Sequence, residues 1–205
     1  NLAHSFYQIG NYEQSMEILQ LVLEKNPNLS FANLYMGYNL LEMGKKEEAL
    51  TSFQNTAKND PQQMGTVMRE IGLVSLLKEI DKNPGDPILL RSLAEYYNLK
   101  KEYLKSLEYS LPLLQQDQMN LKILQIIVYS YRGLGEAKEV LMYGGRYSLI
   151  DPEEMHLQFI MAEIFVQLNK CTKALPLLEK VLKQDDTYRN AWELKESCQK
   201  SSSTN

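Results

Sequence analysis

Apolar residues recur at the three- and four-residue spacings of amphipathic helices along most of the chain. In the segment 30–61, Met36 and Leu40 fall on one helical face, and Ala49 and Phe53 fall on one face of the next helix. Gly44 stands between the two faces, where glycine ends a helix at low steric cost. The pattern therefore predicts two helices joined by a turn at Gly44.

The proline and glycine residues that end helices recur with a period of about 34 residues, which is typical of stacked helical repeats. Pro27 and Pro61 are one period apart, as are Gly10 and Gly44. Small or compact residues follow the same period further on, at Ala94, Val128 and Ala162, and aromatic residues follow it at Tyr97, Tyr131 and Phe165. An internal repeat at a fixed period of this length indicates a stack of similar helical units.

This combination of residues resembles the tetratricopeptide repeat over roughly residues 1–186. The resemblance implies an all-α fold, a right-handed α-α superhelix of antiparallel helix pairs with about twelve helices. It also implies a protein that binds other proteins or peptides, because each helix pair stacks on its neighbours and leaves long surfaces open. Small residues such as Gly37, Ala49, Ala94, Ala162 and Ala174 are then expected to be buried where helices cross.

The repeat units divide the chain into five parts. Residues 1–61 hold two units, the first beginning partway into its first helix, as expected of a piece of a longer protein. Residues 62–86 hold a lone helix and an irregular junction, and residues 87–186 hold three units. Residues 187–200 are expected to form a capping helix in which Tyr188 and Trp192 cover the last unit, and residues 201–205 a disordered tail.

The register breaks at the junction, because the step from Gly37 to Ala94 is one period plus only about two-thirds of another. The segment 63–80 predicts a single helix, and Gly72, Leu76 and Pro84 align it best with the second helix of a unit. We expect the axis of the stack to change direction there; a flexible region is the alternative. Inter-helix turns are predicted at Gly10, Gly44, Lys101, Gly135 and Asn169.

Composition narrows the classes of function. The chain has 22 basic and 26 acidic residues, a net charge of −4, and no basic stripe, so nucleic-acid binding is not expected. No apolar run approaches the roughly 20 residues that span a membrane. Cys171 and Cys198 are expected to be separate buried or idle thiols. The cytoplasm is favoured slightly, and an export signal removed before Asn1 is the alternative, so the compartment stays open.

No catalytic or metal-binding pattern is visible. The two histidines, His4 and His156, are far apart in repeat order, and the cysteines lack metal-ligand spacing. No candidate nucleophile has a base in a recognisable arrangement. We therefore expect neither an enzyme, nor a cofactor, nor a metal site.

In the family that the chain resembles, the first helix of each pair lines a concave groove that binds the ligand. Exposed aromatic and arginine side chains there are typical of binding hot spots. The alternative is that these aromatic rings pack against neighbouring helices and bind nothing. The predicted partner-binding residues are Tyr7, Leu34, Tyr38, Arg91, Gln125, Tyr129, Arg132 and Phe159.

One subtype of the family grips the acidic tails of chaperones with lysine, arginine and asparagine side chains at set places. Those places hold Arg91 and Glu95, then Ile126, then His156 and Ile160. Glu95 would repel a carboxylate, so an acidic chaperone tail is disfavoured. An amphipathic helix or an extended peptide of mixed polarity suits the groove better.

The sequence thus predicts a non-catalytic protein-interaction module that binds a peptide or helix of a partner as part of a larger assembly. Two alternatives stay open. One is a structural or self-associating repeat region of a longer protein. The other is the regulatory domain of an enzyme or transcription factor whose active part lies outside this chain.

Overall fold

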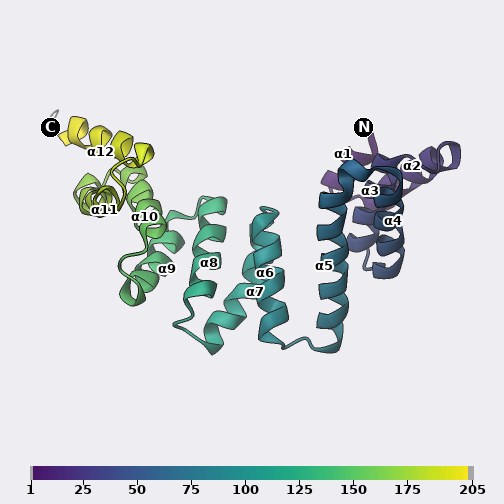
Figure 1. Cartoon of the computed structure of the whole chain (residues 1–205), viewed down its shortest axis with the longest axis horizontal. Helices are drawn as coiled ribbons and strands as arrows, with labels where there is room; N and C mark the ends of the chain where they lie inside the picture. Colours follow the sequence, from purple (N-terminus) through teal and green to yellow (C-terminus); the bar gives the residue numbers. More distant parts are fainter. Residues whose placement is uncertain (1, 203–205) are drawn as a thin grey trace. The chain divides into compact units, whose positions relative to one another are not determined.

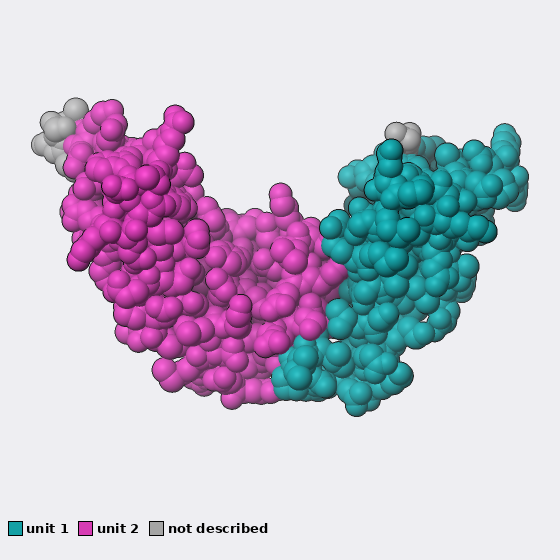
Figure 2. All heavy atoms as spheres, in the orientation of Figure 1, with its two compact units in different colours: residues 1–89 teal, residues 90–205 magenta. Residues whose placement is uncertain are grey.

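This computed structural model describes residues 2–202, and helices joined by short turns make up that part of the chain. Those residues form twelve α-helices and one short 3-10 helix, with no β-strand among them (Figure 1). The all-α class and the expected number of helices are confirmed. The chain divides into two compact units, residues 1–89 and 90–205, which are described separately (Figure 2).

Unit 1 contains α1 (Leu2–Gln8), α2 (Tyr12–Lys25), α3 (Ser30–Glu42), α4 (Lys46–Asn59), η1 (Pro61–Gln63) and α5 (Met64–Lys82). The helix α6 (Pro87–Leu99) begins at the boundary. Unit 2 continues with α7 (Tyr103–Gln116), α8 (Leu121–Leu134), α9 (Ala137–Ile150), α10 (Met155–Gln167), α11 (Cys171–Gln184) and α12 (Arg189–Ser202).

The five predicted turns are confirmed by the backbone. Gly10, Gly44 and Gly135 have positive φ angles, and so do Lys101 and Asn169, with φ of 62° and 56°. Among the described residues, these five are the ones in the left-handed region. A residue in this conformation ends a helix, because the backbone N–H groups there can bond the last carbonyls of the helix. The turns follow directly from the repeat period, even where glycine is replaced.

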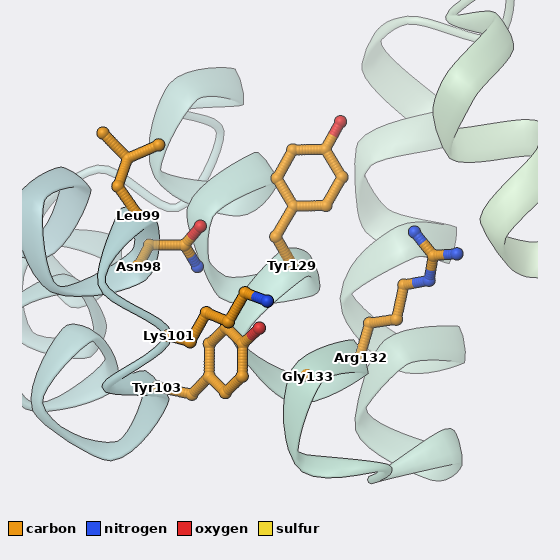
Figure 3. A pocket seen from close by; sticks show the side chains of 7 residues that line it. All are labelled: Asn98, Leu99, Lys101, Tyr103, Tyr129, Arg132 and Gly133. Atoms are coloured by element: carbon orange, nitrogen blue, oxygen red, sulfur yellow. The ribbon is translucent and has the colours of Figure 1, made fainter.

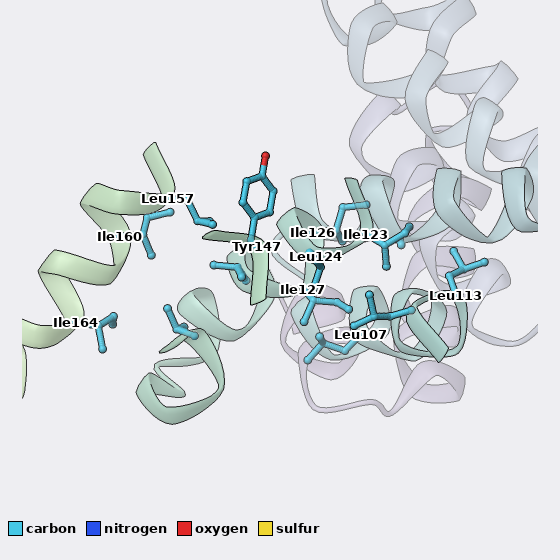
Figure 4. Packing of buried hydrophobic residues seen from close by; sticks show 14 residues of the cluster. Leu107, Leu113, Ile123, Leu124, Ile126, Ile127, Tyr147, Leu157, Ile160 and Ile164 are labelled. Atoms are coloured by element: carbon cyan, nitrogen blue, oxygen red, sulfur yellow. The ribbon is translucent and has the colours of Figure 1, made fainter. Parts of the chain in front are cut away.

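Small residues bring the paired helices together, as predicted. Ala49, Ala94, Ala162 and Ala174 are fully buried, with 0% of their surface exposed. In unit 1 a Cβ atom on Gly37 would lie 2.5 Å from the ring of Phe53, which is itself fully buried. The aromatic ring of α4 therefore occupies the space that glycine leaves on α3. Figure 4 shows the corresponding apolar core of unit 2, built from α6 to α10.

A buried serine hydroxyl crosses a helix pair in each unit. Ser15 Oγ donates to the Ala3 carbonyl at 2.8 Å, and Asn39 Nδ2 of the next helix donates to Ser15 Oγ at 3.0 Å. Unit 2 repeats the arrangement. Ser106 Oγ donates to the Ala94 carbonyl at 2.8 Å, and Ser130 Oγ of the next helix donates to Ser106 Oγ at 3.0 Å. Ser15 and Ser106 are both fully buried, so each hydroxyl links three helices inside the core.

The helix α5 keeps the repeat period, which corrects its alignment. It begins at Met64, one period after α3 begins at Ser30, and it packs against α4. Its buried Val67 and Val74 belong to the same core cluster as Phe53. The helix therefore stands in the place of a first helix, and the match of Gly72, Leu76 and Pro84 to a second helix is wrong. The missing element is the second helix that would follow; the change of axis stays a prediction.

The expectation of two separate thiols is also wrong. Cys171 at the start of α11 and Cys198 near the end of α12 form a disulfide, with Cα atoms 5.3 Å apart. The two residues are 27 positions apart, and they meet because α12 packs against α11. The bond ties the C-terminal helix to the last helix pair.

The C-terminal helix differs in detail from the predicted cap. Ala191 and Cys198 supply its fully buried positions, whereas Trp192 is 45% exposed and covers little of the preceding unit. The helix α12 runs to Ser202, so residues 201 and 202 are helical and not a disordered tail. The rest of the predicted tail, 203–205, lies outside the described residues.

Two glycine-to-alanine variants test the helix crossing. Gly72 lies inside α5, and a Cβ added there would meet nothing within 4 Å. Both Gly37→Ala and Gly72→Ala gain helix propensity, so their difference isolates the clash with Phe53. We expect Gly37→Ala to be less stable than Gly72→Ala by roughly 1–3 kcal/mol in urea unfolding, the usual cost of overpacking. Equal stabilities would contradict the assigned crossing.

Reduction of the disulfide should destabilise the C-terminal helix. The bond closes a loop between residues 27 positions apart, for which a loss of about 2–4 kcal/mol is expected on reduction. The measurement is urea unfolding with and without reductant, with tryptic cleavage at Arg189 reporting on α12. The double variant Cys171→Ser/Cys198→Ser serves as control and should not respond to reductant. Unchanged unfolding of the wild type on reduction would disprove the link.

Candidate functional site

The candidate site is a hollow of about 410 Å³ in unit 2, open to solvent between α6, α7 and α8. Its lining combines aromatic, amide and cationic side chains with one glycine, and all seven appear in Figure 3: Asn98, Leu99, Lys101, Tyr103, Tyr129, Arg132 and Gly133. We call this hollow the first-helix pocket, because α6 and α8 are the first helices of successive pairs.

The local sequence fixes the walls of the first-helix pocket. Asn98 near the end of α6 donates from Nδ2 to Ser130 Oγ at 2.8 Å. Ser130 belongs to the buried serine link, so the amide is anchored to the helix crossing beneath it. The left-handed turn at Lys101 then reverses the chain and starts α7 at Tyr103. The pocket is therefore built directly on the buried crossing of the repeat.

Glycine shapes one side of the pocket. A Cβ atom on Gly133 would overlap the ring of Tyr103, so a larger residue would displace that ring. Figure 3 shows Lys101 extending over Tyr103 toward the middle of the pocket, and Tyr129 rising from the opposite wall. The open surface offers two phenol rings and an amine to a ligand.

Most of the charge beside the pocket is compensated within the protein. Arg132 pairs with Glu163 of α10 at 2.7 Å, and Arg91 pairs with Glu95 at 3.8 Å. Lys101 has no carboxylate within 4.0 Å among the described residues, so it supplies the pocket's uncompensated positive charge. A single lysine can pair with one carboxylate or carbonyl of a ligand.

In unit 2 the structure brings together three of the five predicted site residues. Tyr129 and Arg132 line the pocket, and Gln125 lies one turn before them, with Nε2 3.5 Å from the Tyr129 hydroxyl. Arg91 lies on the neighbouring α6 and is half-exposed. The fifth, Phe159, does not fit the prediction: it is only 7% exposed because Tyr188 packs on it, with ring centroids 5.0 Å apart.

The remaining predicted residues lie in unit 1, where they form a half-buried aromatic surface. The ring of Tyr7 lies 6.1 Å from that of Tyr38 and 6.2 Å from that of Tyr35. Leu34 packs beside them against the core cluster of unit 1. The prediction missed Tyr35, which also contacts Phe31 at 4.4 Å. The sequence signal for Tyr35 was its place beside the buried residues of α3.

Tyr38 is held by a buried carboxylate. Its hydroxyl donates to Glu70 Oε1 at 3.4 Å, and Glu70 of α5 is only 1% exposed. Burial, followed by the nearby Glu70 charge, raises the pKa of the Tyr38 hydroxyl well above its usual value. Tyr38 therefore stays protonated and connects α3 to α5. The residue thus stabilises the packing of unit 1 in addition to forming part of its surface.

Neither a metal site nor a membrane span emerges from the geometry. No group of three or more His, Cys, Asp or Glu side chains within residues 2–202 is arranged to hold a metal ion. None of the helices described has the length and apolar content needed to cross a bilayer.

Two kinds of comparison relate the chain to known proteins. Residues 1–29 and 31–62 match the family model of the tetratricopeptide repeat, and solved structures of such repeat proteins share the fold over most of the chain. The match to the repeat family thus lies in residues 1–62, and over the rest of the chain the likeness is one of fold. No curated protein matches it.

Three solved structures illustrate the likeness in fold. The Cut9–Hcn1 hetero-tetramer of the APC/C is 12% identical, with a TM-score of 0.55, over 96% of this chain and 41% of that chain. The TPR domain of P58(IPK) is 18% identical, with a TM-score of 0.50, over 97% and 53%. YrrB is 16% identical, with a TM-score of 0.51, over 88% and 99%. The protein thus spans about half or less of the first two chains.

Removing the ion pair beside the first-helix pocket should hardly change stability. The side chains of Arg132 and Glu163 are 40% and 27% exposed, and exposed pairs contribute about 0.2–1 kcal/mol. We expect a coupling energy in that range from a double-mutant cycle of Arg132→Ala and Glu163→Ala, measured by urea unfolding. A coupling above about 2 kcal/mol would show that Arg132 is structural and unsuited to ligand binding.

Proposed function

We propose that this protein, a repeat module for protein interaction, is non-catalytic and binds an extended segment or helix of a partner protein on its first-helix faces. The observation that carries the proposal is the first-helix pocket, where Tyr129, Tyr103 and Lys101 converge on one open hollow. Aromatic rings and long cationic side chains give much contact area for little lost freedom, which favours them at binding hot spots. The role within a larger assembly is part of the same proposal.

The charges favour a ligand of mixed polarity. Arg132 and Arg91 are already paired with carboxylates of the protein, so an acidic ligand would have to compete with Glu163 and Glu95. Ile126 and Ile160, which stand at two places of the chaperone-tail clamp, are 7% and 2% exposed and offer no hydrogen bond. We therefore propose a segment with apolar or aromatic side chains and one acceptor group for Lys101.

The comparisons are compatible with this proposal at the level of the family. YrrB is described as a TPR protein with an unusual peptide-binding site, and Cut9–Hcn1 is a hetero-tetramer. Both descriptions concern those proteins. They support peptide binding and assembly with another chain as the functions to test first.

The test uses a displayed peptide library selected on the wild-type protein. Selected peptides are then titrated by calorimetry against Tyr129→Ala, Tyr103→Ala and the control Lys180→Ala, which changes an exposed residue of α11. Loss of a hot-spot ring should weaken binding by roughly 2 kcal/mol, about thirtyfold.

Two results would contradict the proposal. One is full affinity of the selected peptides for both tyrosine variants. The other is a library that yields no binder while light scattering shows the protein to be a stable oligomer. The second result would favour the self-associating alternative.

A further inference from the structure

A second hollow lies in unit 2, in addition to the first-helix pocket. It has a volume of about 550 Å³ and lies along α7, beside the turn between α8 and α9. Leucine side chains and carboxylates dominate its lining, in particular Leu104, Leu107, Leu134, Glu108, Glu136 and Glu139. We call this hollow the acidic groove.

Helix geometry places the acidic groove on the other side of the helices that form the first-helix pocket. On α8, Tyr129 lines the pocket whereas Tyr131 lines the groove. Successive residues turn by about 100°, so side chains two apart point in nearly opposite directions. On α7, the adjacent residues Tyr103 and Leu104, about 100° apart, also line different hollows. A ligand in one hollow therefore leaves the other free.

The floor of the acidic groove is apolar and open. Leu104 is 72% exposed and Leu134 is 37% exposed, while Leu107 is buried beneath them. Leu104, Leu107 and Leu111 follow one another at three- and four-residue spacing, so they form one stripe along α7. The stripe is about 10 Å long, which corresponds to two turns of a helix laid beside it.

The rim of the acidic groove carries uncompensated negative charge. Within the described part of the chain, Glu108, Glu136 and Glu139 have no cation within 4.0 Å. The nearest lysine along α7, Lys105, pairs with Glu102 at 3.1 Å. Burial, then the neighbouring Tyr143, Glu139 and Glu136, raise the pKa of the Tyr131 hydroxyl between the carboxylates.

We propose that the acidic groove is a second docking surface, and that its occupant is an amphipathic helix of a partner protein with lysine or arginine beside its apolar stripe. The leucine floor would take the apolar stripe, and the three carboxylates would take the basic side chains that flank it. Lysine and arginine suit this arrangement because their alkyl stems cover apolar surface while their charges reach the rim. The protein would then hold two ligands on opposite faces of the same helices.

The probe is a designed leucine–lysine amphipathic helix of about 18 residues, with a leucine–glutamate helix of the same pattern as its counterpart. Binding to the full chain is measured by fluorescence anisotropy at several salt concentrations. We expect the lysine helix to bind and the glutamate helix not to bind. We also expect affinity to fall with salt, because the attraction is between surface charges.

Two triple variants distinguish binding at the acidic groove from attraction by the net charge of the protein. The site variant is Glu108→Gln/Glu136→Gln/Glu139→Gln. The control is Glu17→Gln/Glu24→Gln/Glu48→Gln, which removes three exposed carboxylates of unit 1, none of which lines the groove. We expect the site variant to bind the lysine helix at least about tenfold more weakly and the control to bind it nearly as the wild type does. Leu104→Ser should weaken binding as well, whereas Tyr129→Ala should leave it unchanged.

Three outcomes would overturn the proposal. Equal weakening by the two triple variants would mean that only net charge attracts the probe. Weakening by Tyr129→Ala would place the probe in the first-helix pocket. A dimer in sedimentation equilibrium that the site variant dissociates would make a second copy of this chain the occupant. The first-helix pocket is tested with other ligands, and Tyr129→Ala is expected to weaken binding only there, so either proposal can fail alone.

Discussion

The close approach of paired helices is the constraint on which the rest of the structure depends. A compact residue on the first helix faces serine, alanine or valine on the second, because a bulkier pair would overpack the crossing. Where the second residue is serine, as at Ser15 and Ser106, its buried hydroxyl needs a partner, and the carbonyl of Ala3 or Ala94 is within reach. The crossing is thereby fixed by a hydrogen bond as well as by packing.

This constraint also explains how the first-helix pocket is held. Ser130 lies on the serine link and receives the Asn98 amide, so the pocket floor is part of the crossing. The rings and amine above it are free to contact a ligand, while the atoms below them cannot shift without breaking buried hydrogen bonds. Binding surfaces with such support lose little freedom on association.

The helix α5 brings a buried acid into unit 1. The helix keeps the repeat period, but Glu70 stands where the corresponding position of α3, one period earlier, has Met36. A carboxylate with 1% exposure requires hydrogen-bond partners, and Tyr38 supplies one from α3. A residue predicted to bind a ligand is thus also a partner of the protein's own buried acid. The surface of unit 1 is therefore coupled to the packing of its last helix.

The sequence by itself determined the helices, the turns and the buried small residues, because these depend on neighbours close in the chain. Even the turns at Lys101 and Asn169, which lack the usual glycine, were predicted from the repeat period, and the structure shows both residues to be left-handed. It also placed Tyr129 and Arg132 on an open face. Only the tertiary structure decided that Cys171 reaches Cys198, that Tyr188 covers Phe159, and that Glu163 neutralises Arg132. Those contacts join side chains on different helices, and the periodicity of one helix carries no information about which partner the next helix presents.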